Sequence, residues 1–266
     1  MKLYILIILI GVLFMSEAYS QPPFRKSLET RSAGLVLNMH WLQLNDAQFS
    51  PLNYSGPGGE IMISSVRSYD NIRRHLNIGA SGDYIQNSLG FNAVYLRPEI
   101  VVGVTYLVND LSTENSLSYF GGSFSATSRM YRFLNEDPDH LYWATSYTVD
   151  FHYFFDMEVG EKRRGLFELR FPIAGVSSRP SDDNHYSFQL PGFGEYMKRL
   201  HENIGFSTWN TMQAVNATLL IDLSRTRKRS FSLGYELDFA RFTKPEPVIY
   251  LSNSLFLRLF IDSLVW

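Results

Sequence analysis

Hydrophobic and polar residues alternate almost without error along residues 146–159, where Phe154 is the exception in the polar row. Successive side chains of a β-strand point to opposite faces, so this period of two predicts a strand with one apolar and one polar face. Such a strand is typical of a transmembrane barrel wall, which has lipid outside and a polar interior. The apolar row is Tyr147, Val149, Phe151, Tyr153, Phe155, Met157 and Val159, and the polar row is Ser146, Thr148, Asp150, His152, Asp156 and Glu158.

The same alternation recurs along the chain and is clearest toward the C-terminus. It appears in 98–108, 117–133, 165–175, 213–224, 230–242 and about 254–266, with weaker signals in 33–44, 60–68, 72–86 and 88–97. Strands of ~10 residues with connections of similar length give about 12 strands for the mature chain, or about 10 if some loops are long. The predicted fold class is therefore all-β, a transmembrane antiparallel up-and-down β-barrel.

The segment 254–266 follows the pattern less well. One row holds Leu255, Leu257, Leu259, Ile261 and Val265, and the other holds Phe256, Arg258, Phe260, Asp262, Leu264 and Trp266. In bacterial barrels the terminal aromatic usually lies in the lipid-facing row, which here would also contain Arg258 and Asp262. We therefore expect a register shift or bulge near the end of this strand.

The first twenty residues have the features of an export signal. Lys2 precedes the apolar run 3–14, and Ala18-Tyr19-Ser20 offers small residues before Gln21. We expect a signal peptide at 1–20 and a barrel at 21–266. No later stretch approaches the ~18 apolar residues of a membrane-spanning helix. The chain has 0 cysteines, which favours a bacterial envelope over a eukaryotic secretory route.

An even number of strands places both chain ends on one side of the membrane. Taking Trp266 as a periplasmic end makes 160–164 and 225–229 periplasmic turns, and 134–141, 176–209 and 243–249 extracellular loops. The long loop 176–209 contains Tyr196, Met197, Leu200 and Ile204 on one helical face. This spacing predicts a short helix over the barrel mouth or on the membrane surface.

The polar rows of these strands supply the candidate functional residues. They are Asp150, His152, Asp156, Glu158, Glu168, Arg170, Asp222, Glu236, Asp238 and Arg258. They could form a selectivity lining, or Asp150 and His152 could be a proton-transfer pair. Alternatively, they form a buried ionic network that fills a narrow barrel. The buried network is favoured, and it predicts little or no steady conductance. Because the interior is polar, arginine should be tolerated better at position 152 than at position 151.

Catalytic chemistry has few candidates. An outer-membrane lipid-modifying enzyme, of the acyl hydrolase or acyltransferase type, needs a hydroxyl activated by an imidazole. Asn184-His185-Tyr186-Ser187 offers both groups, as do Ser146, Thr148 and His152, but the His-x-Ser-Asn-Gly pattern of the outer-membrane phospholipases is absent. The run 136–140, Glu-Asp-Pro-Asp-His, could attract a divalent cation, although such runs are more often solvated loop tips. We assign no catalytic, cofactor or metal residues, and favour a non-enzymatic small channel, envelope-structural protein or surface-interaction scaffold.

Composition argues against nucleic acid as a partner. The net charge is −2 and charged residues make up only 19% of the chain, so no large basic field exists. The expected partners are outer-membrane lipids and lipopolysaccharide and, during biogenesis, the barrel-assembly machinery.

Four further features are the signal peptide, Tyr95-Leu96-Arg97-Pro98-Glu99, Phe171-Pro172-Ile173 leading to Ser178-Arg179-Pro180, and the terminal aromatic strand. In these features the chain resembles the small outer-membrane β-barrels of Bacteroidota. The resemblance implies an outer-membrane barrel and contributes no catalytic residues.

Overall fold

A computed structural model describes residues 30–47, 50–69, 71–113, 115–134, 142–159, 163–179, 198, 200–201, 203–225, 229–244 and 246–264. These residues form eleven strands and one short 3₁₀ helix, η1 (Asn109–Leu111). The strands are β1 (Thr30–Asp46), β2 (Ser50–Tyr69), β3 (Ile72–Asn87), β4 (Asn92–Leu107), β5 (Ser116–Phe133), β6 (Tyr142–Val159), β7 (Arg163–Ser178), β8 (Ile204–Thr208), β9 (Met212–Arg225), β10 (Arg229–Phe242) and β11 (Val248–Leu264). None of the described residues forms a helix with the length and apolar character needed to cross a membrane.

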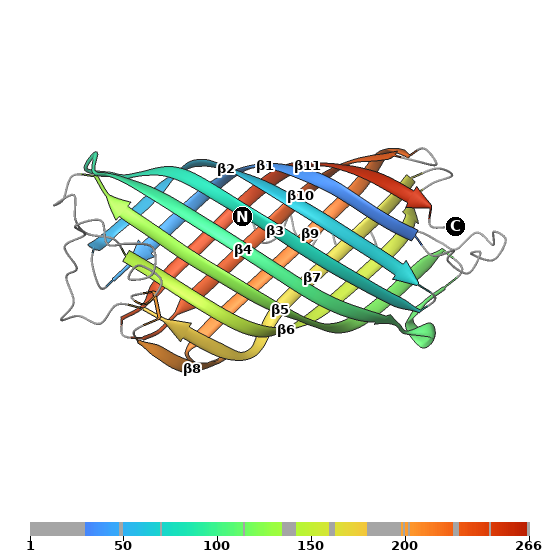
Figure 1. Cartoon of the computed structure of the whole chain (residues 1–266). Coiled ribbons are helices and arrows are strands. Elements are labelled where there is room, and N and C mark those ends of the chain that lie inside the picture. Colours follow the sequence, from blue (N-terminus) through green and yellow to red (C-terminus); the bar gives the residue numbers. More distant parts are fainter. Residues whose placement is uncertain are drawn as a thin grey trace.

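The sheet closes on itself (Figure 1). Its order is β6-β5-β4-β3-β2-β1-β11-β10-β9-β7, and pairing of β6 with β7 completes the ring. Every neighbouring pair is antiparallel, and β8 adds a short eleventh strand on the end of β7, at residues 174–178. The fold is thus a closed ten-stranded antiparallel barrel with one extra strand, in which backbone groups of the wall pair within the sheet.

The expected strand number was about 12, and the alternative of 10 is the one observed. The difference comes from strand length, because the wall strands have from 14 residues in β9 to 20 residues in β2 rather than ~10. Strands of this length extend beyond the hydrocarbon thickness of a bilayer and absorb residues that the sequence estimate assigned to loops.

The two ends of the barrel differ in their connections. We call the end where β1 begins and β11 ends the terminal end, and the other the loop end. The strand ends that flank the turns predicted at 160–164 and 225–229 lie at the terminal end. Those that flank the loops predicted at 134–141, 176–209 and 243–249 lie at the loop end. β7 and β8 occupy parts of 176–209, and Ile204 begins β8, so the predicted helical face does not extend to Ile204.

Several predicted features fall outside the described residues. These are the signal peptide at 1–20, the acidic run at 136–140, the segment 184–187 that contains the candidate His185 and Ser187, most of the helical segment, and Trp266.

The outward face of the wall carries an apolar belt. On β3 the exposed outward positions run from Arg74 through Leu76, Ile78, Ala80, Gly82 and Tyr84 to Gln86. With a rise of ~3.3 Å per residue and a tilt of ~40°, this stretch spans roughly 30 Å along the barrel axis. The belt continues around the wall through exposed residues such as Leu37, Met39, Ile63, Val102, Leu255 and Leu257. Polar side chains at both limits of the β3 stretch therefore bracket a band of bilayer dimensions.

The register of β11 corrects one expectation. β11 pairs with β1 without interruption from Val248 to Leu264, so the predicted bulge is not present in this described segment. Leu255, Leu257, Leu259 and Ile261 point outward, and Arg258 points inward, with its guanidinium 4.9 Å from the Phe260 ring centre. The register instead shifts between β6 and β7 beside Pro172, which lacks a backbone N–H, and between β9 and β10.

Candidate functional site: the barrel interior

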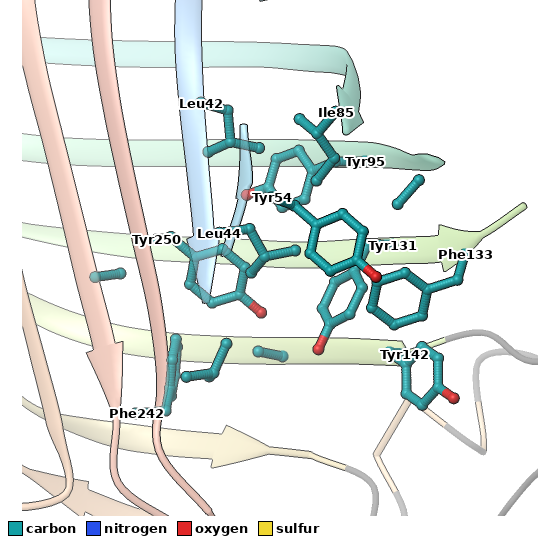
Figure 2. Close-up of a cluster of buried hydrophobic side chains, with 14 of the residues drawn as sticks. Leu42, Leu44, Tyr54, Ile85, Tyr95, Tyr131, Phe133, Tyr142, Phe242 and Tyr250 are labelled. Atoms are coloured by element: carbon teal, nitrogen blue, oxygen red, sulfur yellow. The ribbon is translucent and has the colours of Figure 1, made fainter. Parts of the chain in front are cut away.

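Apolar and aromatic side chains close the interior at the loop end (Figure 2). They form the aromatic cluster, Leu42, Leu44, Tyr54, Ile85, Ala93, Tyr95, Tyr131, Phe133, Tyr142, Ala144, Met212, Ala240, Phe242, Val248 and Tyr250. Its rings are in direct contact, with centres 4.9 Å apart for Tyr54 and Phe133 and 5.5 Å apart for Tyr131 and Tyr142. Because nine wall strands contribute to it, the aromatic cluster occupies the cross-section of the barrel at this level.

An arginine anchors the loop-end connections to the aromatic cluster. Arg179 follows β7 and donates from Nη1 to the carbonyl oxygens of Lys244 and Glu246, the former at 3.0 Å. Its Nη2 lies 3.4 Å from Asp46, which also accepts a hydrogen bond from the Tyr131 hydroxyl. Three distant parts of the chain therefore meet at one buried carboxylate.

The centre of the barrel holds an ionic network that crosses the interior. Arg97 on β4 pairs with Asp238 on β10 and lies 3.4 Å from Glu60 on β2. Arg170 on β7 pairs with Glu99 on β4 at 2.7 Å, and Arg129 on β5 lies 3.7 Å from Asp238. We call these six residues the central network. Its three guanidinium groups face three carboxylates, and such balance is what allows charges to be buried.

Three histidines lie in the interior near the central network. His40 Nε2 is 2.6 Å from Asp83, and His152 Nε2 is 2.8 Å from Glu168. The His152 ring stacks on Phe154 with centres 4.3 Å apart and meets the edge of His75 at 4.4 Å. Gly103 makes room for this arrangement, because a Cβ there would clash with the His75 ring. The histidines are thus packed parts of the core.

The structure distributes the ten predicted interior residues over these regions. Arg170 and Asp238 belong to the central network, and Glu236 accepts a hydrogen bond from Asn216 at 2.9 Å. Glu168 pairs with His152, whereas Asp150 accepts a hydrogen bond from Ser125. Asp156, Asp222 and Arg258 line a cavity at the terminal end. Glu158 is exposed at the end of β6, because its position lies beyond the packed interior.

Two chemical pairings considered from the sequence are not formed. Asp150 and His152 have different partners, so they do not make a proton-transfer pair. The second pairing, of His152 with the hydroxyl of Ser146 or Thr148, is not formed either. Among the described residues, the Nδ1 atom of His152 has no hydrogen-bond partner and its Nε2 pairs with a carboxylate. Ser146 and Thr148 are both buried. No group of three or more metal-ligating side chains occurs in the described residues.

Several interior charges were missed by sequence reasoning. Glu60, Arg97, Glu99 and Asp83 lie on β2, β3 and β4, where the inner row mixes charges with apolar residues and the alternation is weak. For Arg97 and Glu99, the sequence did contain a signal. They occupy alternate positions in Tyr95-Leu96-Arg97-Pro98-Glu99, so they share one face of the strand, and Leu96 and Pro98 lie on the outer face.

Little empty space remains between these side chains. A cavity of about 150 Å³ lies at the terminal end, and two smaller cavities of about 40 Å³ each lie deeper. One small cavity is lined by Glu60, Glu99, Glu236 and Arg258, among others, and has room for a few water molecules. The described residues therefore form a filled interior with one hydrated end.

Comparison with known proteins supports the fold. No family model and no curated protein matches the chain. Among solved structures, the outer membrane protease OmpT from Escherichia coli aligns with a TM-score of 0.51 and 6% identity, over 92% of this chain and 99% of that one. The translocator domain of the autotransporter NalP from Neisseria meningitidis aligns over 89% of each chain, with a TM-score of 0.44 and 9% identity. At these identities, the likeness concerns the barrel fold alone.

Proposed function

We propose that this chain is an integral barrel protein of the bacterial outer membrane, exported by the signal peptide at 1–20, with both termini in the periplasm. The observation that carries the proposal is the apolar belt on a closed barrel, since contiguous apolar surface of this extent is rare on soluble monomers. Its partners are outer-membrane lipids and lipopolysaccharide and, during biogenesis, the barrel-assembly machinery. The affiliation with small Bacteroidota barrels is part of the proposal, and its support is the sequence resemblance.

We further propose that the barrel is a non-enzymatic, non-conducting scaffold of the envelope. The aromatic cluster and the central network fill the interior in succession, and the cavities between them hold only a few water molecules. In a ten-stranded barrel, side chains alone suffice to do this. The wall then serves to hold the loop-end segments at the membrane surface.

Planar bilayers test the closed interior. Purified full-length protein, with folding checked by its faster migration on an unboiled gel, is expected to give no steady conductance above the bare membrane. Large and stable openings would reject the scaffold in favour of a channel. Recovery of the exported protein in the soluble periplasm would reject the membrane location itself.

Cysteine labelling tests the orientation, because the chain has 0 cysteines of its own. Ser88→Cys at the loop end and Asp110→Cys in η1 at the terminal end both place a thiol at an exposed position. In whole cells, a membrane-impermeant maleimide is expected to label Ser88→Cys at once. It should label Asp110→Cys only after the outer membrane is permeabilised, and the reverse pattern would invert the proposed orientation.

A further inference from the structure

Two interior arginines differ from the others in their partners. In the described part of the chain, Arg97, Arg129, Arg164, Arg170 and Arg179 each lie within ion-pair distance of a carboxylate. Arg73 and Arg258 form no ion pair with a described residue. Each has a buried Nε atom without a hydrogen-bond partner there, a feature that Arg97 and Arg129 share. Their guanidinium groups lie instead over the rings of Phe154, at 4.3 Å, and Phe260, at 4.9 Å.

Both arginines line the same cavity, the one of about 150 Å³ at the terminal end. Arg258 also lines one of the deeper cavities, so it stands between the mouth and the centre of the barrel. The cavity wall adds the hydroxyl groups of Ser32, Ser68 and Ser230. Guanidinium and hydroxyl donors around one hydrated space are the groups that bind an oxyanion.

The carboxylates of this cavity already have partners. Asp222 accepts a hydrogen bond from Ser232 at 2.6 Å, and Asp156 lies 3.7 Å from Arg164. Deeper in the barrel, Glu168 is held by His152. The lining carries three positive charges, from Arg73, Arg164 and Arg258, and two negative charges, from Asp156 and Asp222, so its net charge is positive. Burying such charge is unfavourable unless a counter-ion accompanies it.

We propose that the terminal-end cavity is an oxyanion site, in which Arg73 and Arg258 bind a phosphate group. A volume of about 150 Å³ holds one tetrahedral oxyanion together with some water. The phosphate comes either as a free ion or as the headgroup of a lipid at the membrane surface, since the cavity lies at the rim of the wall. This site adds to the scaffold function and depends neither on the orientation of the barrel nor on its conductance.

Calorimetry on the full-length protein in neutral detergent micelles tests the site. Inorganic phosphate is titrated at constant ionic strength, with chloride as the control anion. Saturable heat with phosphate, together with an apparent melting temperature that rises by a few degrees, is the expected result. An equal response to chloride would mean general ionic screening and would overturn the proposal.

A matched pair of neighbours supplies the decisive variants. Arg73 faces the cavity, whereas Arg74, the next residue, is exposed on the outer face. Arg73→Gln and Arg258→Gln should each weaken phosphate binding about tenfold or more, because a charge-assisted hydrogen bond is lost. Arg74→Gln should leave it unchanged. If Arg74→Gln weakens binding as much as Arg73→Gln, the anion binds outside and the proposed site is wrong.

A second variant keeps the test independent of arginine removal. Ser68 lies opposite Arg73 in the pairing of β2 with β3 and lines the cavity. Ser68→Asp places a carboxylate beside the guanidinium, so it should raise the melting temperature without phosphate and abolish the further rise with phosphate. A Ser68→Asp protein that still binds phosphate as the wild type does would overturn the proposal.

The two sources of phosphate are distinguished by a second titration. A short-chain phosphatidic acid and a short-chain phosphatidylcholine are compared in the same micelles. Tighter binding of the phosphatidic acid than of inorganic phosphate, reduced by Arg258→Gln, assigns the site to a lipid headgroup. Equal binding of phosphatidic acid and inorganic phosphate assigns the site to the free ion. If neither phosphatidic acid nor inorganic phosphate binds, the site is rejected.

Discussion

The two ends of the interior are enclosed by the same ten strands, yet their inner side chains differ in kind. At the loop end, aromatic rings touch one another and Arg179 has both Asp46 and two backbone carbonyls. At the terminal end, serines and charged groups share the lining of the cavity of about 150 Å³ with Val66, Leu166, Leu220 and Phe260. There Arg73 and Arg258 face rings rather than carboxylates. A narrow barrel can therefore be closed by neutral side chains at one end while it remains hydrated at the other. The central network separates these two environments.

The largest effect is expected at the boundary between the two ends. Arg97→Met leaves Glu60 and Asp238 buried without their main counter-charge and should lower the free energy of unfolding by about 3–5 kcal/mol. Urea unfolding of the refolded protein in lipid vesicles, followed by tryptophan fluorescence, measures this loss. Arg132→Met is the control, because Arg132 is exposed on the outer face of β5. A loss below 1 kcal/mol for Arg97→Met would show that water screens the centre, and the distinction between the two ends would then fail.

The loop end is probed by removing one ring of the aromatic cluster. Tyr131→Leu deletes ring contacts and the hydrogen bond to Asp46, and should cost about 2–3 kcal/mol of unfolding free energy. Tyr84→Leu is the matched change on the outer face, where Tyr84 is 52% exposed, and should cost less than about 1 kcal/mol. The same urea titration serves both variants. Similar losses in the two proteins would contradict a tightly packed loop end.

A glycine tests how closely the histidines are packed. Gly103→Ala introduces a methyl group against the His75 ring and should cost about 1–2 kcal/mol. Gly82→Ala provides the control, because the nearest atom to a Cβ there is a Leu96 methyl at 3.5 Å. Adding His75→Ala to Gly103→Ala should recover most of the loss attributable to the clash. If the double variant loses as much unfolding free energy as the two single variants together, the strain lies elsewhere.

The smallest effect is expected at the terminal rim. Arg164 lies 3.7 Å from Asp156, but its side chain is 32% exposed. Arg164→Gln should therefore change the free energy of unfolding by only about 0–1 kcal/mol, because solvent screens such a pair. Comparing Arg164→Gln with Arg97→Met shows how the contribution of an arginine–aspartate ion pair to the free energy of unfolding depends on its depth in the barrel. A loss as large as that of Arg97→Met would mean that the terminal end is not hydrated.

The sequence predicted the wall better than the contents. Alternation in β6 and β10 was strong enough to assign nearly every side chain to one face, because apolar and charged residues occupy separate rows. In β1 the inner residues Leu42 and Leu44 are as apolar as the outer residues Trp41 and Met39, so no contrast revealed the aromatic cluster. The strand number was overestimated for a related reason. Alternation fades where a strand extends beyond the apolar belt, so each strand was taken to be shorter than it is.

Partners across the interior were beyond sequence reasoning. Arg97 and Asp238 are separated by 141 positions and meet only because the closed register sets both at the same depth. At position 152, the sequence predicted the strand face on which the side chain lies but not the residues that it contacts. His152 has 0% exposure and packs against Phe154 and His75, so the expected tolerance of arginine there does not follow from the structure. A larger cation at this position has no free space.

The seam between β1 and β11 has a consequence for how the molecule forms. It joins the first 17-residue strand of the described chain to the last, so the ring contains contacts of nearly maximal sequence separation. Contacts of this kind form late, because a long loop must be closed before they contribute. Until β11 is in place, β1 and β10 expose unpaired edges that readily associate with other chains. Assembly of this barrel is therefore committed only when the final strand arrives, and loss of that strand yields an aggregating chain rather than a smaller barrel.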